Sequence, residues 1–281
     1  MEKLIITLAV TGNVPTKELN PSTPITPKEI ADDIEACMHY GASIAHIHAR
    51  DNNQQPTHSK KSYKAILDEI KSRKLSIITQ LSTGARGGHN TVDSRGQMLD
   101  LDCEMGSLAT GSSNFPNTIN ANEPELIEAL ATKMYKNGIR PEIEAFDVAM
   151  ISNAKRYIKK GILKAPLHFN LVMGVPGSIE GTPRNLLFMV ESLPENSTWS
   201  VCGIGPAQIP MLTMSILMGG HVRTGLEDTL LYRKGVPATN RMLVERVHRL
   251  AGELGREIAS PDEARKILEI KSSIGKFLKK L

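Results

Sequence analysis

Short apolar runs rich in β-branched residues alternate with longer amphipathic stretches along nearly the whole chain. A short apolar run bounded by turn residues is typical of a buried strand, whereas apolar residues that recur every three or four positions are typical of a helix. On this basis the pattern predicts eight strands, at Leu4–Val10, Ser43–His48, Ser76–Leu81, Met105–Ala109, Glu142–Phe146, Pro166–Leu171, Thr198–Cys202 and Gly220–Arg223.

The amphipathic stretches between these runs begin with helix-capping residues. At Thr26-Pro27-Lys28-Glu29 the threonine can cap a helix, the proline suits its first turn, and the glutamate can bond back to the cap. The same signal at Ser260-Pro261-Asp262-Glu263 predicts a terminal helix. Further helices are predicted at Lys60–Arg73, Pro124–Asn137, Val148–Lys160, Pro183–Glu191, Ile209–Met218 and Thr239–Leu254.

Eight strand–helix repeats within 281 residues favour a (β/α)8 TIM barrel over an open, doubly wound sheet. No linker or low-complexity stretch divides the chain, so we expect one domain over residues 1–281 with a C-terminal helical tail from about residue 261. In such barrels the active site lies at the C-terminal ends of the strands and in the loops that follow them.

Composition narrows the class of protein. Hydrophobic residues make up 40% and charged residues 23%, as in ordinary globular proteins. A net charge of +4 and an aromatic content of 4% provide neither the basic surface nor the stacking platform of a nucleic-acid-binding protein. The three cysteines are too widely spaced for a disulfide framework. No segment resembles a signal peptide or a membrane span, and we therefore expect a cytoplasmic protein without a membrane partner.

His46 and His48 lie two residues apart at the end of the second predicted strand. Because side chains alternate across a strand, both imidazoles project from the same face. Two converging imidazoles can supply two ligands to a transition metal, most often Zn²⁺. A catalytic metal would need at least one more protein ligand and an open position.

The last predicted strand and its loop, Gly219–Asp228, are the best place to seek that ligand, because this strand lies beside the first one when the barrel closes. The segment contains His221, Arg223, Glu227 and Asp228. A carboxylate beside two histidines completes a metal site with open positions. Either Glu227 or Asp228 could be this ligand, and the other could act as a base.

A glycine-rich turn, Gln80–Gly88, follows the third predicted strand. Its backbone N–H groups could hold an anion, with Ser82 and Thr83 as hydroxyl donors. The spacing matches neither a P-loop nor a dinucleotide-binding fingerprint. The turn Val172–Ser178 reads similarly, and His168 is interpreted as a core histidine with its hydrogen bonds satisfied.

Several of these segments together resemble the β-keto acid cleavage enzymes. The matching motifs are Thr11-Gly12, Thr26-Pro27, His46-Ile47-His48-Ala49-Arg50, Ser82-Thr83-Gly84, Pro141-Glu142-Ile143-Glu144, Gly174-Val175-Pro176-Gly177 and Gly220 to Asp228. The resemblance extends from near residue 4 to near residue 268. It implies a TIM barrel that binds Zn²⁺ through His46, His48 and Glu227. It also implies that a small β-keto acid and acetyl-CoA are converted to acetoacetate and a new acyl-CoA.

The resemblance further implies roles for the other residues of the site. Asp228 would be the base, and Arg223 and Ser82 would position the substrate carbon or hold an oxyanion. No nucleophilic cysteine is required. The predicted substrate-binding residues are Val14, Thr83, Gly84, Ser107 and Glu144.

The chain departs from the founding 3-keto-5-aminohexanoate cleavage enzyme where the substrate tail would bind. That enzyme has a glutamate that engages the substrate's amino group, and the matching residue here is Val14. An unpaired ammonium in a closed pocket would cost roughly several kcal/mol. Ser107 and Ala109 also replace a threonine and an asparagine. We expect a β-keto acid whose tail is uncharged or differently charged.

An amidohydrolase-like metal-dependent hydrolase is the alternative. Those barrels also carry two histidines at a strand end and an acidic residue after the last strand, and Asp228 would then activate water. Their histidine pair usually follows the first strand, however, whereas His46 and His48 follow the second. They usually need a further lysine or two histidines on the middle strands, where only His168 is available. A non-catalytic metal-binding barrel would leave Arg223, Asp228 and Ser82 without a role.

Two further expectations concern assembly and the co-substrate. The resemblance implies a homotetramer, built through the barrel helices and the basic tail Lys271–Leu281, although that tail reads equally well as a solvated helix end. Arg86 and the other basic loop residues are candidates for CoA contacts, without a pattern that separates them.

Overall fold

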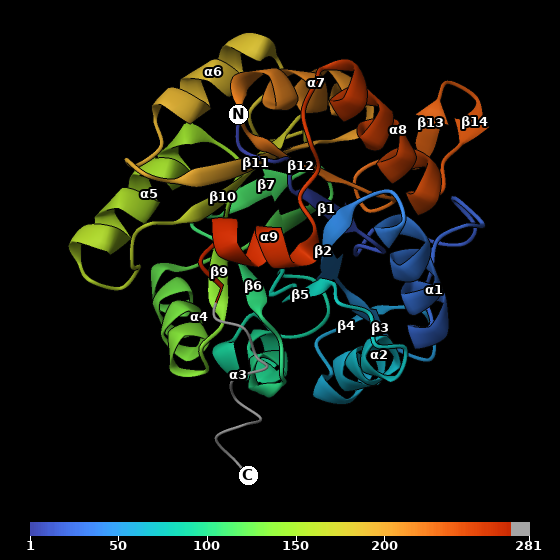
Figure 1. Cartoon of the computed structure of the whole chain (residues 1–281). Helices are drawn as coiled ribbons and strands as arrows, with labels where there is room; N and C mark the ends of the chain where they lie inside the picture. Colours follow the sequence, from blue (N-terminus) through green and yellow to red (C-terminus); the bar gives the residue numbers. More distant parts are fainter. Residues whose placement is uncertain (271–281) are drawn as a thin grey trace.

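The computed structural model describes residues 1–270 and forms a closed barrel of eight parallel strands (Figure 1). Neighbouring strands follow the order β1-β12-β11-β10-β9-β6-β5-β2. Their bounds are β1 (Ile6–Ala9), β2 (Ala42–Ile47), β5 (Ile78–Leu81), β6 (Met105–Ala109), β9 (Arg140–Ala145), β10 (His168–Met173), β11 (Thr198–Gly203) and β12 (His221–Thr224). The predicted fold and all eight predicted strands are confirmed. The tail Lys271–Leu281 lies outside the described residues.

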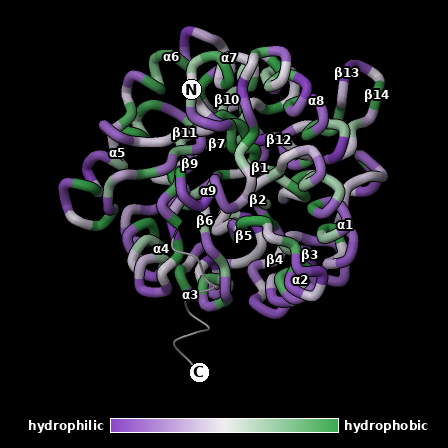
Figure 2. The backbone as a smooth tube through the Cα atoms, viewed as in Figure 1, coloured by the Kyte–Doolittle hydropathy of each residue, from purple (hydrophilic) through white to green (hydrophobic). Residues whose placement is uncertain are grey.

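Helices surround the barrel and bury one face each against it. In the first helix Thr26 accepts a hydrogen bond from the Glu29 amide while Glu29 bonds back, which is the predicted capping box. Hydrophobic and hydrophilic residues alternate along the outer helices (Figure 2). The longer helices of the described residues are α1 (Pro27–Met38), α2 (Lys60–Ser72), α4 (Pro124–Lys136), α5 (Val148–Lys159), α6 (Pro183–Glu191), α7 (Gln208–Met218) and α8 (Asn240–Glu253). The shorter α3 (Val92–Arg95), η1 (Gln97–Asp100) and η2 (Gly205–Ala207) lie in loops.

Three short hairpins that the sequence pattern did not predict extend loops after barrel strands β2, β6 and β12. Each arm has only two or three residues, too few for a periodic pattern to show. The pairs are β3 (Ala49–Arg50) with β4 (Pro56–Thr57), β7 (Ser113–Phe115) with β8 (Thr118–Asn120), and β13 (Leu231–Arg233) with β14 (Val236–Pro237). All three therefore rise at the C-terminal end of the barrel, where the sequence places the active site.

The terminal helix α9 (Pro261–Ile267) lies across the opposite end of the barrel (Figure 1). Ala264 and Leu268 pack against Ile5, Ile44 and Ile78, whose side chains fill the barrel there. Full burial of such aliphatic side chains contributes about 1.5–3 kcal/mol each, so this contact closes the N-terminal end firmly. The described part of the expected tail is thus the floor of the barrel, and access is left from the C-terminal end.

Two further predictions can be compared with the described residues. Cys37, Cys103 and Cys202 are all buried, as their apolar settings indicated. Within residues 1–270, no helix has both the length and the apolar character that a bilayer crossing requires.

Candidate active site

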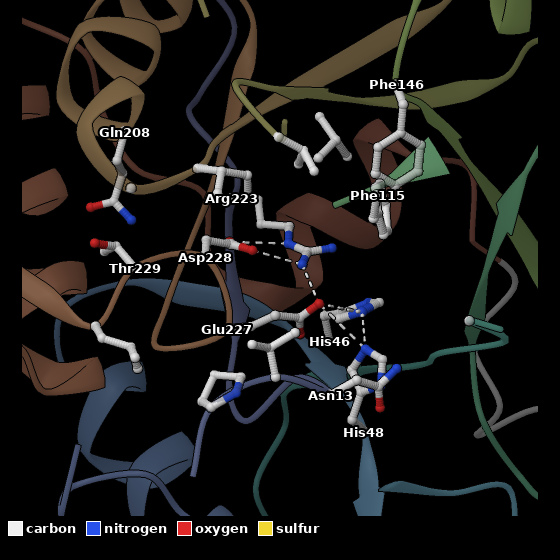
Figure 3. A pocket seen from close by; sticks show the side chains of 18 of the residues that line it. Asn13, His46, His48, Phe115, Phe146, Gln208, Arg223, Glu227, Asp228 and Thr229 are labelled. Atoms are coloured by element: carbon white, nitrogen blue, oxygen red, sulfur yellow. Dashed lines mark hydrogen bonds and ion pairs between the residues drawn. The ribbon is translucent and has the colours of Figure 1, made fainter. Parts of the chain in front are cut away.

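A cavity of about 1300 Å³ opens at the C-terminal end of the strands. Its walls come from the ends of all eight barrel strands and the loops that follow them, and the two phenylalanines Phe115 and Phe146 face the charged cluster across it (Figure 3). The predicted site residues that line this cavity are Val14, His46, His48, Ser82, Gly84, Glu144, Arg223, Glu227 and Asp228.

Three potential metal ligands converge in the cavity (Figure 3). The Nε2 atoms of His46 and His48 are 3.1 Å apart. Glu227 Oε1 lies 3.7 Å from His46 Nε2 and 3.3 Å from His48 Nε2. A tetrahedral zinc ion with bonds of about 2.0–2.2 Å separates its ligand atoms by roughly 3.3–3.5 Å. The three side chains therefore already have the spacing of a zinc site.

Hydrogen bonds to the Nδ1 atoms fix the tautomer and the ring orientation of both histidines. His46 Nδ1 lies 2.6 Å from Gln80 Oε1, and His48 Nδ1 lies 2.9 Å from Asn13 Oδ1. Because an amide oxygen only accepts, both Nδ1 atoms donate, and each Nε2 keeps a lone pair. Burial, helped by the Arg223 charge, lowers the pKa of His46 to about 4, so this ring is neutral at physiological pH. Two facing lone pairs beside a carboxylate oxygen suit a cation between them.

Arg223 contacts the three carboxyl groups of the site, and Figure 3 shows its bonds to two of them, Glu227 and Asp228. Its Nη2 lies 2.6 Å from Glu227 Oε1 and 2.9 Å from Asp228 Oδ1, and its Nε lies 3.2 Å from Asp228 Oδ2. Its Nη1 lies 3.2 Å from Glu144 Oε1. One guanidinium thus faces three carboxyl groups, and a divalent cation would offset the excess negative charge when they ionise.

These carboxyl groups differ in their readiness to hold a proton. Burial acts to raise the pKa of each. At Glu227 the neighbouring charges, that of Arg223 foremost, outweigh burial and hold the pKa well below its usual range. At Asp228 burial prevails and the pKa is raised, and burial raises the pKa of Glu144 to about 7. Glu227, which is ionised and faces both Nε2 atoms, has the character of a ligand, and Asp228 has the character of a base.

A second group of metal-ligating side chains is looser. His46 also lies near Glu142 and Glu144, with ligand atoms within 4.8 Å of one another. Glu142 is fully buried, however, and is not among the described residues that line the cavity. The first group has shorter separations and is open to a substrate.

Close packing between two loops brings Glu227 into place. Gly12 adopts a left-handed φ of +68°, and a Cβ there would lie 2.5 Å from Glu227 Cγ, so only glycine fits. Asn240 Oδ1 accepts from the Leu226 amide at 2.8 Å, and Asn240 Nδ2 donates to the Val10 carbonyl at 2.9 Å. The loops after β1 and β12 are thereby tied together around the carboxylate.

Of the catalytic and substrate-binding residues predicted in the glycine-rich turn after β5, only Ser82 and Gly84 line the cavity among the described residues. Ser82 lines the cavity and its Oγ accepts from the Gly84 amide at 3.2 Å, which leaves its hydroxyl hydrogen available. Thr83 and Ser107 are buried and bonded to each other, with Thr83 Oγ1 donating to the Ser107 carbonyl at 2.6 Å. Neither of these two predicted residues is among the described residues that line the cavity, and their contact with a substrate stays a prediction. Arg95 Nε donates to the Thr83 carbonyl at 2.6 Å and holds the turn.

The remaining histidines of the barrel lie outside the site. His221, offered by the sequence beside Glu227, is at the start of β12, where its Nδ1 accepts from the Ile5 amide at 3.1 Å. His221 therefore lies away from the candidate metal ligands and is not a candidate for the third ligand. His168 Nδ1 lies 2.9 Å from Thr198 Oγ1, and its Nε2 lies 3.3 Å from Glu142 Oε2, at ion-pair distance rather than in a well-aligned hydrogen bond.

Sequence reasoning missed the hydrogen-bond partners of the ligand histidines. Gln80 and Asn13 carry no metal-ligand pattern, and neither stands at a fixed spacing from a histidine. A signal for Gln80 existed in the strand register, because His46 on β2 pairs directly with Gln80 on β5. Asn13 lies in a loop, where register gives no guidance.

Comparison with known proteins defines the class. The family described as beta-keto acid cleavage enzyme (BKACE) matches residues 3–270. The chain therefore belongs to the β-keto acid cleavage enzymes, and it is a TIM-barrel enzyme of the transferase class.

Two relatives and one solved structure give the detail. A 3-keto-5-aminohexanoate cleavage enzyme from Acetoanaerobium sticklandii is 46% identical over 96% of this chain and 99% of its own length. A 3-oxoadipate:acetyl-CoA acetyltransferase from Cupriavidus necator is 38% identical over 95% of each chain. The apo structure of ObcA, at 22% identity, aligns with a TM-score of 0.74 over 89% of this chain and 66% of the ObcA chain, which supports the barrel fold.

Proposed function

We propose that this chain is a zinc-dependent transferase that cleaves a β-keto acid with acetyl-CoA and releases acetoacetate and a new acyl-CoA. The observation that carries the zinc assignment is the pair of Nε2 lone pairs facing each other across 3.1 Å beside Glu227. The Cupriavidus necator relative is an acetyl-CoA acetyltransferase by name, which supports acetyl-CoA as the co-substrate. Family membership disfavours the amidohydrolase-like alternative.

His46, His48 and Glu227 would hold the zinc ion, since all three line the cavity that a substrate would enter. Bound zinc would polarise the oxygens of a β-keto acid and make the carbon between its two carbonyl groups more acidic.

Asp228 would remove the proton from that carbon. Its carboxyl group is buried at the cavity and has a raised pKa, which makes it a stronger base than an exposed aspartate. Two hydrogen bonds from Arg223 fix its orientation, and each carboxylate oxygen retains a second lone pair for the proton. Ser82 would donate its hydroxyl hydrogen to a substrate oxygen.

The exchange then balances without another reactant. The deprotonated carbon forms a bond to the acetyl carbon of acetyl-CoA, and the CoA thiolate moves to the keto carbon of the substrate. The bond between that keto carbon and the deprotonated carbon breaks, Asp228 returns the proton, and acetoacetate and the new acyl-CoA leave. Glu144 and Gly84 would contribute to the walls around the substrate, since both line the cavity.

Val14 is the residue that we propose to select the substrate tail. Its side chain lines the cavity and is 58% exposed, so a substrate can reach it. Valine offers no ion-pair or hydrogen-bond partner for an ammonium group, so an ammonium tail gains nothing there over a neutral one. Homotetramer formation, a cytoplasmic location and the one-domain organisation of residues 1–281 stay predictions.

A panel of β-keto acids with the zinc-loaded protein tests the proposal. Acetoacetate should form only when acetyl-CoA is present, and metal analysis should find about one zinc ion per chain. Substrate consumption without acetyl-CoA would instead support the hydrolase. Faster turnover of 3-keto-5-aminohexanoate than of neutral β-keto acids of similar length would contradict the role of Val14.

A further inference from the structure

A group of basic residues lines the outer part of the same cavity. Arg233 and Lys234 lie on the β13–β14 hairpin, and Arg246 lies on α8 beside it. We call these three residues the hairpin cluster. Figure 1 shows this hairpin next to α8, at the edge of the barrel.

The hairpin cluster carries positive charge that the described protein does not neutralise. Within residues 1–270, no carboxylate lies within 4.0 Å of these three cationic groups, whereas Arg223 contacts three. Arg246 instead donates to the Tyr232 carbonyl at 2.6 Å, and its guanidinium lies 3.7 Å from the centre of the Tyr232 ring. Although burial opposes the effect, hydrogen bonds from Arg249 and Arg246 lower the pKa of Tyr232, as a local excess of positive charge would.

The opposite side of the cavity differs. The β7–β8 hairpin follows β6, four strands around the barrel from β12, and its residues at the cavity are Phe115, Pro116, Asn117, Thr118 and Asn120. None of these is charged. Arg86 is a single cation there, 5.8 Å from the ring of Phe115. A ligand with several negative charges therefore finds its counter-charges at the β13–β14 side.

An apolar path joins the hairpin cluster to the reacting groups. Leu230 and Leu231 follow Asp228 closely in the chain and line the cavity, as do Ile204 and Ile209. Arg233 is five residues beyond Asp228, so the Cα atoms of the two residues are at most roughly 18 Å apart. The hairpin cluster thus lies at the outer end of a mainly apolar wall.

We propose that the hairpin cluster binds the phosphate groups of the acyl-CoA co-substrate, with the pantetheine arm along the apolar wall and the thioester beside Asp228. The inference rests on the proposed function, because it assigns the anionic end of that co-substrate. Phosphates are recognised by unpaired arginine and lysine groups, which form charge-assisted hydrogen bonds to their oxygens. TIM barrels frequently bind phosphate through the loops after their seventh and eighth strands, which here are β11 and β12.

Direct binding of adenosine 3′,5′-bisphosphate tests the site without catalysis. The double variant Arg233→Ala/Lys234→Ala should weaken this binding roughly 10-fold, measured by calorimetry at low salt. The matched control Lys155→Ala/Lys159→Ala removes two exposed lysines from α5 on the outside of the barrel and should leave binding unchanged. Equal affinity of the wild type and the hairpin variant would overturn the proposal.

Kinetics with a shortened co-substrate separate this inference from the proposed function. In the hairpin variant kcat/KM should fall at least about fivefold more for acetyl-CoA than for acetyl-pantetheine, which lacks the nucleotide phosphates. An equal fall for both would show general damage and overturn the inference. A wild-type protein that binds the bisphosphate through the hairpin cluster but does not turn over acetyl-CoA would overturn the proposed function alone.

Discussion

The interior of the barrel contains two layers of ionisable groups that behave differently. On β9, Glu142 and Glu144 are two residues apart, and on β12 so are His221 and Arg223, so each pair points to the same face at successive depths. The upper layer, with Glu144 and Arg223, reaches the cavity together with the ligand histidines. The lower layer, with Glu142, His168 and His221, is buried beneath it.

Both layers hold polar atoms without a hydrogen-bond partner among the described residues, in Glu142 and His168 below and in Glu227 above, but only the upper layer opens into the cavity. His168 lies between Thr198 and Glu142, and His221 accepts from a backbone amide. In the upper layer the Nε2 atoms of His46 and His48 face each other, and Glu227 Oε2 is buried without a hydrogen-bond partner among the described residues. Residue type alone therefore does not identify a metal site. A candidate site is instead identified by ligand atoms that lack a hydrogen-bond partner and face an open cavity.

The largest effects should come from removing a histidine of the upper layer. His48→Gln should abolish zinc binding and lower kcat/KM at least roughly 1000-fold, because the polarisation supplied by the metal is lost. His168→Gln is the matched change in the lower layer. It should keep one zinc ion per chain but lose about 3 kcal/mol of unfolding free energy, since Glu142 is left buried without its partner. Metal analysis measures the zinc content of the two variants, and urea unfolding measures their stability. Loss of zinc from His168→Gln but not from His48→Gln would place the metal site in the lower layer.

Asp228→Asn should lower kcat by about 100- to 10000-fold, the range expected for removal of a general base. Asparagine keeps one of the two oxygens that accept from Arg223, so the zinc content should stay near the wild-type value. Steady-state kinetics at saturating acetyl-CoA provide the measurement. A kcat within tenfold of the wild type would assign the base to another residue.

Strand periodicity and strand-end chemistry made the barrel and its candidate metal ligands predictable. His46 and His48 stand on a strand whose alternation is legible from the sequence, and Glu227 and Asp228 follow another such strand. The contacts that orient them were not predictable, since Gln80 and Asn13 look like ordinary polar residues until the register and loop path are known. For the same reason the sequence did not predict that Thr83 and Ser107 bond to each other.

Removing the amide that orients His46 should have an intermediate effect. Gln80→Leu takes away the acceptor of the Nδ1 hydrogen, so the ring is no longer held with Nε2 toward the site, and zinc affinity should fall about 10- to 100-fold. Competition with a chelating dye measures it. Gln208→Leu is the matched control, because Gln208 is also buried at the cavity but does not hydrogen-bond a histidine among the described residues. A similar loss in both variants would contradict an orienting role.

The smallest effect concerns the two glutamates of β9 and appears as a pH dependence in metal-free protein. The pKa of Glu144 is raised to about 7 from an unfolded value of 4.5, so the folded state holds this proton more tightly and its contribution to stability is lost as the pH rises through 7. Glu144→Gln cannot lose that proton. The unfolding free energy of Glu144→Gln relative to the wild type should therefore rise by about 1 kcal/mol when the pH is raised from 6 to 8.

Glu142→Gln is the matched variant on the same strand, because the pKa of Glu142 is shifted in the opposite direction to that of Glu144. Although burial raises it, the neighbouring His168 holds the pKa of Glu142 below its usual range, so its contribution to stability is present above pH 4.5 and lost only as the pH falls below that value. The difference between Glu142→Gln and the wild type should accordingly stay constant from pH 6 to pH 8. Urea unfolding in the presence of a chelator compares the two slopes. If the unfolding free energies of Glu144→Gln and Glu142→Gln depended on pH in the same way, the two carboxyl groups would not differ in pKa as their depths in the barrel predict.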